Sequence, residues 1–486
     1  MTNIHIKQAL IIAAGNGSRL KRSTHDTTPK PLRKLLGMPI IERIILSAKK
    51  AGIEAVTVVV GYQADKMAAY FKSRDLGVAV TLVENPDWKK SNGVSALAAR
   101  TALGNRPFVL LMADHVFDPA ALKACIADGV RDGEVKLAVD DRIAEIDDLD
   151  DATKVHCNAA RGTIEHISKT LPTYTAIDTG MFCCTSALFD VLAGIYATAG
   201  DCSLSQGMQI LASQGRLSYW AFPKSSYWQD VDTKPAFKIA ERKLLHACIK
   251  STDGIISRNF NRRISLFFTR FLVKTGIHAN TVTGFTTLVG ALSGVTAAHG
   301  TYWSFVLGAF LFKMASILDG CDGEMSRLRF SNSKLGQWLD TASDNLTYMM
   351  FFIGLMVGVY RQEHSPYFAY WVGMTVFGIG MLLATMFFYL IRYTNSGSLV
   401  SLQKDLETRD NLMPKGAARL LAEKCGFMIK RDFFAALFLF FALINEADWI
   451  LYVTMIGSNV GWMVLFNMRR SIFVASESEV VHDSSY

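Results

Sequence analysis

The sequence predicts an α/β domain followed by an all-α membrane domain, on three observations. At 486 residues the chain is longer than one ordinary domain, and a hydrophobic content of 50% with a positive mean hydropathy is too high for a wholly soluble protein. Up to about Lys250, strand-like and helix-like segments alternate among mixed charges. From about Thr281 onward, charged residues become scarce inside long apolar runs, as in membrane-spanning segments.

The first half begins with a continuous apolar segment, Ala9–Ala14, which predicts a buried strand. A glycine-bearing turn and a helix over Pro39–Ala51 follow. Further strands are expected at Ala55–Val60, Val78–Val83, Phe108–Met112 and Val135–Val139. Alternating strands and helices predict a mostly parallel sheet covered on both faces. The opening apolar run is too short for a signal peptide and lacks a small-residue cleavage site, so we expect this domain in the cytosol.

Between the two halves, Arg258–His278 alternates basic and apolar residues at roughly helical spacing. This pattern predicts an amphipathic helix in the membrane interface beside anionic lipid, and a soluble amphipathic linker is the alternative. Six apolar segments follow, each expected to cross the membrane: Ala279–His299, Tyr302–Leu318, Leu335–Tyr360, Tyr367–Arg392, Asp432–Ile444 and Asp448–Met468.

Basic residues predict the orientation of these six segments. Lysines and arginines cluster before the first segment, between the second and third, between the fourth and fifth, and after the sixth, whereas the other loops hold only Arg361. Because cytoplasmic loops carry the excess of Lys and Arg, we expect a multi-pass protein of the cell (inner) membrane with the first domain and both termini cytoplasmic. This topology also accounts for the net charge of +8, so no nucleic-acid partner is expected. The eight cysteines show no metal spacing and are expected to be reduced.

The most specific motif of the first half is "LIIAAGNGSRL" followed by "TPKPL". Gly15 and Gly17, in a turn after a buried strand, let backbone N–H groups approach a triphosphate, while Arg19 and Lys30 supply positive charge. A glycine pair alone fits an ordinary tight turn equally well. The full combination, with Lys30 between two prolines, resembles the signature of the sugar-phosphate nucleotidyltransferases, whose domain is Rossmann-like.

This resemblance implies roles for individual residues. The loop that starts at Ala13 would bind the nucleoside triphosphate, and Lys30 would stabilise the charge that develops at the attacked phosphorus. Asp114 in "LLMADHVF" would hold Mg²⁺, and a second metal carboxylate is expected in "YWQDVDT", at Asp230 with Asp232 as the alternative. The segment "ENPDWKKSNGVSAL" resembles the base- and substrate-binding segment of the family, which nominates Asn92, Gly93 and Ser95.

Ordinary structural roles compete with several of these assignments. Asp114 and Asp230 also suit turns at strand ends, where Asp is common. Asn92 and Gly93 also suit a hairpin-type turn. Contact with the phosphorylated substrate and an ordinary structural role fit four further residues equally well: Lys154, Asp178, Thr179 and Gly180.

The stretch "SILDGCDGEMSRLRFSNSKLGQWLDTASDN" places four aspartates between apolar segments. Asp319 and Asp322 are three residues apart, and Asp340 and Asp344 are four apart, so each pair lies on one face of its helix. One unpaired Asp at mid-bilayer costs about 2.5 to 3.5 kcal/mol, which divalent cations offset better than one or two arginines do. Oxygen-only ligation around phosphates points to Mg²⁺, with Mn²⁺ as the alternative, in both halves of the chain.

Read with its glycines and its arginine, this stretch resembles the CDP-alcohol phosphotransferase signature, with Ser326 where alanine is usual. The resemblance implies that Asp319, Asp322 and Asp340 hold a two-metal site on the CDP pyrophosphate. Asp344 would be the base that deprotonates the acceptor hydroxyl. Other candidate binding residues are Gly323 and Gly336, which would admit the nucleotide, Arg327, which would balance phosphate charge, and Asn280 and Thr283 in "HANTVT". Lys430 and Arg431 suit an acceptor phosphate and the topology rule equally well.

Two such motifs in one chain suggest consecutive reactions. In "ADHVF", "SRNFNRRIS" and "SILDGCDGE" the chain resembles the bifunctional inositol-1-phosphate cytidylyltransferase and di-myo-inositol phosphate phosphate synthase family. This implies that the first domain makes CDP-inositol and pyrophosphate from CTP and inositol 1-phosphate. The membrane domain would then transfer phosphoinositol to a second inositol 1-phosphate, giving di-inositol phosphate phosphate and releasing CMP.

Two other readings stay open. The first keeps the chemistry but uses a different phospho- or phosphono-alcohol and a lipid (diacylglycerol-type) acceptor. The composition, with eight cysteines, nineteen methionines and only 19% charged residues, argues against a hyperthermophilic source. Because di-inositol phosphate is a heat-stress solute, this composition favours the lipid acceptor. The second is a non-catalytic nucleotide-sensing membrane protein, against which complete metal motifs in both halves argue.

The expected organisation is an α/β Rossmann-like nucleotidyltransferase domain plus an all-α membrane domain of six transmembrane helices. We expect a cytosolic domain at 1–250, an interfacial helix or linker at 251–278, a CDP-alcohol phosphotransferase domain at 279–470 and a cytosolic tail at 471–486. The partners expected are CTP, a phospho-alcohol, a CDP-alcohol and membrane lipid. The resemblance also implies a homodimer formed through the membrane domain.

Overall fold

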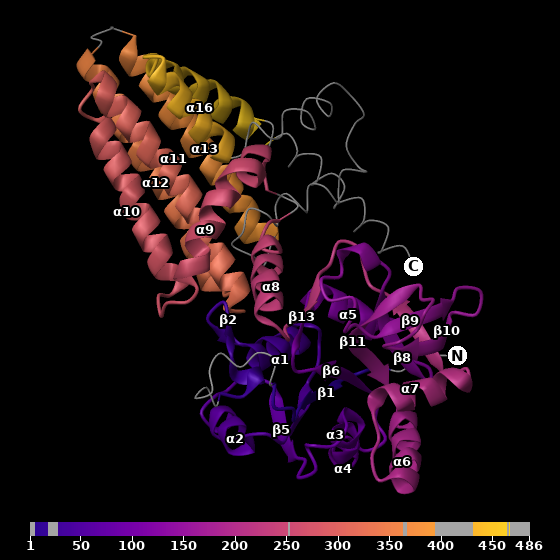
Figure 1. Cartoon of the computed structure of the whole chain (residues 1–486). Coiled ribbons are helices and arrows are strands. Elements are labelled where there is room, and N and C mark those ends of the chain that lie inside the picture. The colour runs from indigo at the N-terminus through magenta and orange to yellow at the C-terminus, as the bar shows by residue number, and fades with distance from the viewer. Residues whose placement is uncertain are drawn as a thin grey trace, which may run out of the picture. The chain divides into compact units, whose positions relative to one another are not determined.

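The computed structural model describes residues 5–17, 28–250, 253–362, 367–393, 431–463 and 466. The chain divides into two compact units, Met1–Ala247 and Cys248–Tyr486 (Figure 1). Arg19, Lys430 and the expected tail at 471–486 lie outside the described residues, and Arg431 is described as the first residue of a helix.

The first unit is built on a nine-stranded sheet with the order β5-β4-β1-β6-β11-β8-β12-β10-β9. Its strands are β1 (Gln8–Ala13), β4 (Ala55–Val60), β5 (Ala79–Glu84), β6 (Phe108–Met112), β8 (Val135–Asp140), β9 (Lys154–Asn158), β10 (Thr163–Ser168), β11 (Ala176–Cys184) and β12 (Leu217–Ala221). Two smaller pairs lie outside this sheet: β2 (Lys34–Leu35) with β3 (Met38–Pro39), and β7 (His115–Phe117) with β13 (Trp228–Asp230).

The parallel part of the sheet agrees with the prediction, and the rest differs from it. β1 pairs in parallel with β4 and β6, and β4 pairs in parallel with β5. Beyond β6 only β8 and β12 of the described strands pair in parallel, and β11 runs antiparallel to both β6 and β8, so the expectation of a mostly parallel sheet is wrong there. An apolar run predicts a buried strand but carries no information on strand direction, which explains the difference.

The predicted strands of the first unit and its predicted helix are each confirmed to within one residue at either end. The helices and 3₁₀ turns of this unit are η2 (Lys30–Leu32), α1 (Ile40–Lys50), α2 (Ala64–Lys72), α3 (Asn92–Ala98), α4 (Arg100–Leu103), α5 (Pro119–Asp128), η3 (Ile143–Glu145), α6 (Ala187–Ala199), α7 (Leu204–Ser213) and α8 (Lys234–His246). A core of buried side chains fills the space between the sheet and α3, α6 and α7, where Phe108 stacks on Phe189 at 5.0 Å between ring centroids.

The second unit is helical. Its helices are η4 (Ser257–Asn261), α9 (Arg262–Leu272), α10 (Ala279–Ala297), α11 (Tyr302–Leu328), α12 (Lys334–Gln362), α13 (Phe368–Tyr393), α16 (Arg431–Leu443) and a helix over 448–463. Figure 1 shows α10, α11 and α12 running side by side, and α10 makes its most extensive contacts with the other two. Among the described residues of this unit, α11, α12 and the stretch Phe368–Phe388 of α13 are long and apolar enough to cross a membrane.

Glycines let α10 and α12 approach closely. A Cβ placed on Gly354 would lie 1.9 Å from the carbonyl oxygen of Gly294, and one on Gly358 would lie 2.3 Å from that of Ala297. Small residues in this pattern are the usual means by which membrane helices pack backbone against backbone. In the same unit, Phe312 of α11 stacks on Phe351 of α12 at 4.6 Å within a buried aromatic core.

The helix α9 turns its polar side toward α11. Glu324 of α11 is fully buried and accepts hydrogen bonds from Arg262 (2.8 Å), Ser265 (2.7 Å) and Thr269 (2.6 Å). Phe267 and Phe271 of α9 are 60% and 56% exposed. The apolar side of this amphipathic helix therefore faces away from the rest of the unit.

Candidate active sites

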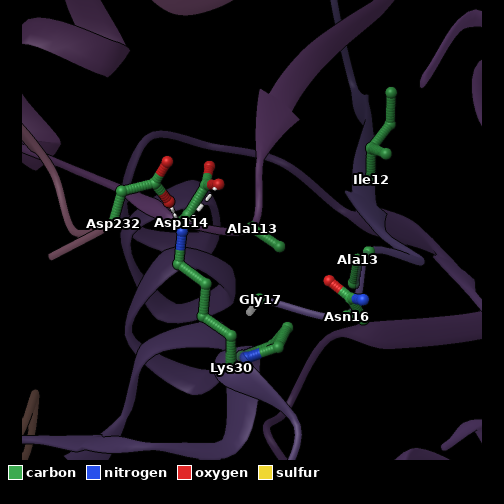
Figure 2. Close-up of a pocket in the computed structure, with 10 residues that line it drawn as sticks. Ile12, Ala13, Asn16, Gly17, Lys30, Ala113, Asp114 and Asp232 are labelled. Atoms are coloured by element: carbon green, nitrogen blue, oxygen red, sulfur yellow. Dashed lines mark hydrogen bonds and ion pairs between the residues drawn. The ribbon is translucent and has the colours of Figure 1, made fainter. Parts of the chain in front are cut away.

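A cavity of about 260 Å³ lies at the carboxyl end of β1 in the first unit. Its lining comes from Ile12, Ala13, Gly15, Asn16, Gly17, Lys30, Pro31, Ala113, Asp114 and Asp232. The strands β1 and β6 run in parallel, so their carboxyl ends meet at one edge of the sheet, where ligands of open α/β sheets bind. Figure 2 shows Lys30 reaching across this edge toward Asp114 and Asp232.

The two predicted glycines contribute in different ways. A Cβ on Gly15 would meet nothing within 4 Å, so the backbone at Gly15 faces open space. Gly17 has a φ of +56°, and a Cβ there would lie 2.5 Å from Cβ of Lys30. A side chain at Gly17 would therefore be strained and would displace Lys30.

Lys30 is the buried cation of this cavity. Its Nζ donates to Oδ2 of Asp114 at 2.9 Å and also contacts Oδ1 of Asp232. Lys30 is the first residue of the η2 turn and directly follows Pro29. The proline ring fixes the backbone φ of Pro29 and so the direction in which the turn begins. Two carboxylates therefore hold the ammonium group at the cavity wall.

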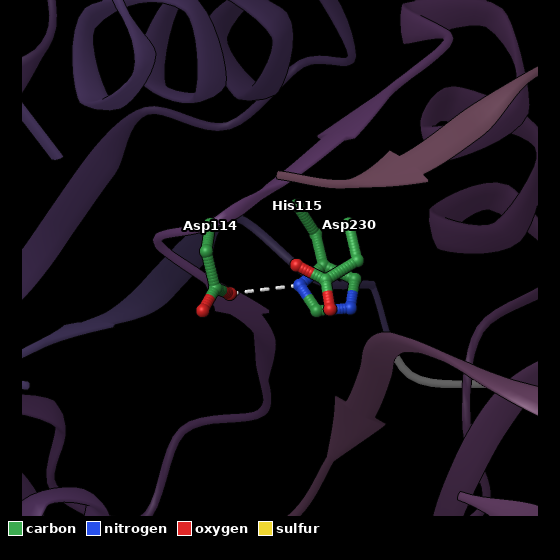
Figure 3. Close-up of side chains that lie close together, drawn as sticks. All are labelled: Asp114, His115 and Asp230. Atoms are coloured by element: carbon green, nitrogen blue, oxygen red, sulfur yellow. Dashed lines mark hydrogen bonds and ion pairs between the residues drawn. The ribbon is translucent and has the colours of Figure 1, made fainter. Parts of the chain in front are cut away.

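A second cluster, made of Asp114, His115 and Asp230, adjoins the cavity (Figure 3). The pairing of β7 with β13 sets His115 opposite Asp230, and one ligand atom from each of the three residues lies within 4.8 Å of the others. His115 Nδ1 lies 2.8 Å from Oδ1 of Asp114, and its ring stacks on Trp228 with an interplanar angle of 2°.

Burial and neighbouring charges shift the pKa of all three residues of this cluster. Burial alone would raise the pKa of Asp114, but the charge of Lys30 and the hydrogen bond with His115 outweigh it and hold that pKa well below its usual range. Burial would lower the pKa of His115, but Asp230 and Asp114 outweigh it and raise that pKa. Burial also raises the pKa of Asp230, and the charge of Asp114 adds to the rise.

The residues of this cluster fit a divalent cation. Oδ1 of Asp230 is buried and has no hydrogen-bond partner among the described residues. A buried carboxylate oxygen without a partner is costly, and a cation bound between Asp114 and Asp230 would remove that cost. Carboxylate oxygens are the ligands that Mg²⁺ and Mn²⁺ prefer.

The structure places Asn92, Gly93 and Ser95 on α3 and not among the residues that line the cavity. Asn92 Oδ1 accepts from the backbone N–H of Leu204 at 2.9 Å, and the buried Ser95 hydroxyl accepts from Asn85 at 3.0 Å. A Cβ on Gly93 would lie 2.6 Å from the carbonyl oxygen of Cys202. In this structure the three residues join α3 to neighbouring segments.

The other substrate candidates of the first unit mostly contact backbone. Thr179 donates to the carbonyl of Ala138 at 2.8 Å, and Lys154 donates to that of Lys169 at 3.0 Å. Asp178 accepts from Gly180 N at 2.7 Å, and burial raises its pKa to about 6. Gly180, with a φ of +77°, makes room for the ring of His115.

Three of the four aspartates of the second unit form one cluster, and the fourth, Asp322, makes hydrogen bonds beside it. Asp319 of α11 meets Asp340 and Asp344 of α12 in a cluster with ligand atoms within 4.8 Å of one another. The carboxylate of Asp322 instead accepts hydrogen bonds from the Thr283 hydroxyl and from the backbone N–H of Gly323. Three oxygen donors from two facing helices fit a hard divalent cation.

The other predicted residues lie around this cluster. Arg327 Nε and Nη2 are buried without a hydrogen-bond partner among the described residues, which suits an anionic ligand. A Cβ on Gly323 would lie 3.2 Å from Nη1 of Arg327, so Gly323 gives the guanidinium room. Gly336 lies near Asn280, and its N–H donates to the Ser333 hydroxyl at 2.9 Å.

Sequence reasoning missed two residues. His115 was not assigned a role, although it directly follows Asp114 and joins the metal-fitting cluster. Glu324 was not assigned a role either, although a carboxylate so close to the apolar part of α11 needs a partner. Its partners lie on α9, so motif spacing within one segment gave no signal for them.

Comparison with known proteins matches both units. The model of a MobA-like NTP transferase domain matches residues 9–146, and the model of the CDP-alcohol phosphatidyltransferases matches residues 277–466. The bifunctional IPC transferase and DIPP synthase of Aquifex aeolicus is 30% identical over 379 residues, which cover 78% of this chain and 82% of that protein. The protein of the same name from Rubrobacter xylanophilus is 33% identical over 353 residues, 72% of this chain and 77% of that protein.

A third similarity covers a shorter part of the chain. The 2-aminoethylphosphonate cytidylyltransferase of Lancefieldella rimae is 36% identical over 131 residues, 26% of this chain and 52% of that protein. Nucleotidyltransferases and CDP-alcohol phosphotransferases generally use divalent metals, and each unit has a cluster of residues that fits one. The second family and the apolar helices also indicate association with a membrane.

Because the similarity spans both units, the chain belongs to the family of bifunctional IPC transferase and DIPP synthase enzymes, with a CTP-dependent nucleotidyltransferase and a CDP-alcohol phosphotransferase in one polypeptide.

Proposed function

We propose that the first unit makes CDP-inositol and pyrophosphate from CTP and inositol 1-phosphate. A phosphate oxygen of inositol 1-phosphate attacks the α-phosphorus of CTP, a new P–O bond forms, and the bond to the pyrophosphate group breaks. Pyrophosphate leaves with the bonding electrons. The observation that carries this proposal is the pairing of a glycine-lined cavity that holds a buried lysine with a metal-fitting cluster beside it, in a chain of this family.

The side chains around the cavity have separate tasks in this reaction. Asp114 and Asp230 would hold Mg²⁺, or Mn²⁺ as the alternative, which would neutralise phosphate charge when bound. Lys30, and Arg19 outside the described residues, neutralise charge on the phosphate groups as the leaving bond breaks. The backbone from Ala13 to Gly17 lies against the triphosphate, and the missing side chain at Gly15 leaves space there.

The second unit transfers phosphoinositol from CDP-inositol to a hydroxyl of a second inositol 1-phosphate. The acceptor oxygen attacks the phosphorus that carries the inositol, and the bond from this phosphorus to CMP breaks. Asp344 takes the proton of the acceptor hydroxyl, and Asp319 and Asp340 would hold the metal on the pyrophosphate. The orphaned guanidinium of Arg327 supports a role in phosphate binding, and we assign the acceptor phosphate to Lys430 and Arg431.

Asp322 has a supporting task in this scheme that differs from the family pattern. Its oxygens hold Thr283 and the Gly323 N–H, so Asp322 fixes the start of α10 against α11. The family pattern implies that Asp322 binds a second cation. To do so, its oxygens must release the Thr283 hydroxyl or the Gly323 N–H.

We also propose the arrangement in the membrane. Six spans, with the first unit and both termini in the cytoplasm, agree with the alternation of basic and non-basic loops. The residues 258–278 lie in the interface, supported by the outward aromatic face of α9 and by the exposed Arg263 beside it. The expected boundaries at 250, 278 and 470 and a homodimer through the membrane unit complete this proposal.

Two product measurements on the purified chain with Mg²⁺ test the scheme. CTP and inositol 1-phosphate should release pyrophosphate, and CDP-inositol with inositol 1-phosphate should release CMP. Absence of pyrophosphate release with inositol 1-phosphate, while another phospho-alcohol supports it, would disprove the assignment of the alcohol and leave the reaction type in place.

A second candidate function replaces the alcohol and the acceptor. The 36% identity with a 2-aminoethylphosphonate cytidylyltransferase over 131 residues favours a phosphonate in place of inositol 1-phosphate. A lipid hydroxyl would then be the acceptor in the membrane. A radiolabel from CTP-activated 2-aminoethylphosphonate that moves into organic solvent when diacylglycerol is added would support this candidate, and a label that stays in water would exclude it.

A further inference from the structure

Three carboxylates surround Lys30 and the adjoining cluster, and they do not have equivalent positions. Asp114 and Asp230 share the metal-fitting cluster with His115. Asp232 lines the cavity and contacts the Nζ of Lys30. Asp114 belongs both to this cluster and to the pair of carboxylates that contact Lys30, because its Oδ2 also accepts from Lys30 at 2.9 Å.

The backbone on both sides of Asp232 is fixed. The N–H of the fully buried Val231 donates to the carbonyl of Asp114 at 2.9 Å. Thr233 caps α8, with its hydroxyl accepting from the N–H of Ala236 at 3.3 Å. Asp232 therefore stands between two anchored residues and keeps its position at the cavity wall.

Binding of a divalent cation changes the balance of charge on Lys30. A cation on Asp114 engages the carboxylate that Lys30 shares and repels the ammonium group. Asp232 is then the anion that keeps Lys30 in place. One lysine and one divalent cation together carry three positive charges, which match the negative charges of three ionised carboxylates.

We propose that Asp232 is a positioning residue that holds the Lys30 ammonium at the cavity wall while a divalent cation occupies Asp114 and Asp230. The sequence left open which of the two aspartates is the second metal ligand. Under this proposal Asp230 binds the metal, and Asp232 holds the Lys30 ammonium. The inference rests on the proposed function of the first unit, in which Lys30 acts on the triphosphate.

Amine acetylation of the full-length protein in detergent, followed by mass spectrometry of the Lys30 peptide, reads the position of this side chain without reference to activity. In the native protein Lys30 should be protected with and without Mg²⁺. In Asp232→Asn, Asp114 still holds Lys30 without Mg²⁺, so protection should remain, and Mg²⁺ should raise the acetylation rate at least about tenfold. In Asp230→Asn, which loses a metal ligand, millimolar Mg²⁺ should leave Lys30 protected.

Kinetics supply the second readout. A misplacement of a reacting group by about 1 Å costs on the order of 100-fold in rate, so kcat for pyrophosphate release should fall by about that factor in Asp232→Asn. The KM for CTP should stay the same or fall, because the cavity gains positive charge. Asp232→Glu keeps the charge and should restore both protection and most of the rate.

Two results would overturn the proposal. One is a Lys30 that stays equally protected in Asp232→Asn at saturating Mg²⁺. The other is a Mg²⁺ requirement that rises in Asp232→Asn as it does in Asp230→Asn, which would make Asp232 a metal ligand. If Lys30→Met retains full pyrophosphate release, the proposed catalytic role of Lys30 fails instead, while the acetylation result still decides the task of Asp232.

Discussion

The strongest prediction concerns Glu324, the buried carboxylate through which α11 holds α9. Its oxygens accept from Arg262, Ser265 and Thr269 at 2.6 to 2.8 Å, and Arg262 is also held by Asp253 at 2.8 and 2.9 Å. Removing one partner of a buried ion pair costs about 3 to 5 kcal/mol. Because Arg262 keeps Asp253, we expect the lower value, about 3 kcal/mol, for Glu324→Ala.

This cost should appear as local opening between α9 and α11. Cys321 is fully buried under α9, with its Sγ 3.4 Å from the carbonyl oxygen of Ser265, so a thiol reagent reaches it when α9 separates from α11. About 3 kcal/mol corresponds to roughly a 100-fold rise in the labelling rate of Cys321, since 1.4 kcal/mol is tenfold. N-ethylmaleimide labelling of the detergent-solubilised protein, read by mass spectrometry, measures this rate.

Three comparisons make the result specific. Glu324→Gln keeps the volume and loses the charge, so its effect should be smaller, about tenfold. Glu446→Ala removes the same side chain at an exposed position and should change nothing. Cys125, buried in the first unit, should label at the wild-type rate in every variant. A Cys321 rate in Glu324→Ala within a factor of three of wild type would refute the reasoning.

Three further predictions separate the two sites and test the helix packing. Asp344→Asn should lower CMP release from a CDP-alcohol by about 10² to 10⁴ and leave pyrophosphate release unchanged; parallel loss of both would contradict two independent sites. Lys30→Met should show the reverse pattern, with a fall of about 10² to 10³ in pyrophosphate release, and normal release in this variant would refute its role. Gly354→Leu should lower the thermal stability of the second unit, because its Cβ would lie 1.9 Å from the Gly294 carbonyl, whereas Gly373→Leu, with nothing within 4 Å, is the control; equal melting of both would argue against the α10–α12 contact.

The first unit shows how far sequence patterns reach. Apolar runs located β1, β4 and β6 to within one residue, because burial on both faces leaves a continuous signal in the chain. The same runs did not reveal that β11 enters the sheet antiparallel to β6, since strand direction depends on connections far away in sequence. The glycine loop and Lys30 were found because they lie within one motif.

Three residues share one property, which is a hydrogen-bond partner on another element: Asp322, Asn92 and Glu324. Asp322 was grouped with Asp319 by spacing, but its carboxylate contacts Thr283 of α10. Asn92 was nominated by resemblance, but its amide oxygen caps the backbone at Leu204. Spacing along one helix predicts which side chains share a face. It does not predict which residues of other elements that face contacts.

Close packing of α10 against α12 explains why the face of α10 that carries Thr283 and Thr287 lies near the carboxylates. Where Gly294 and Gly354 allow backbones to touch, the rest of α10 follows α12 closely toward the aspartates. At that end the Thr287 hydroxyl contacts that of Ser343, one residue before Asp344. Thr283, one turn away, contacts Asp322 on α11. The small residues thus determine how near the hydroxyl-bearing face of α10 comes to the carboxylates, so a wider crossing should weaken metal binding even though no aspartate has changed.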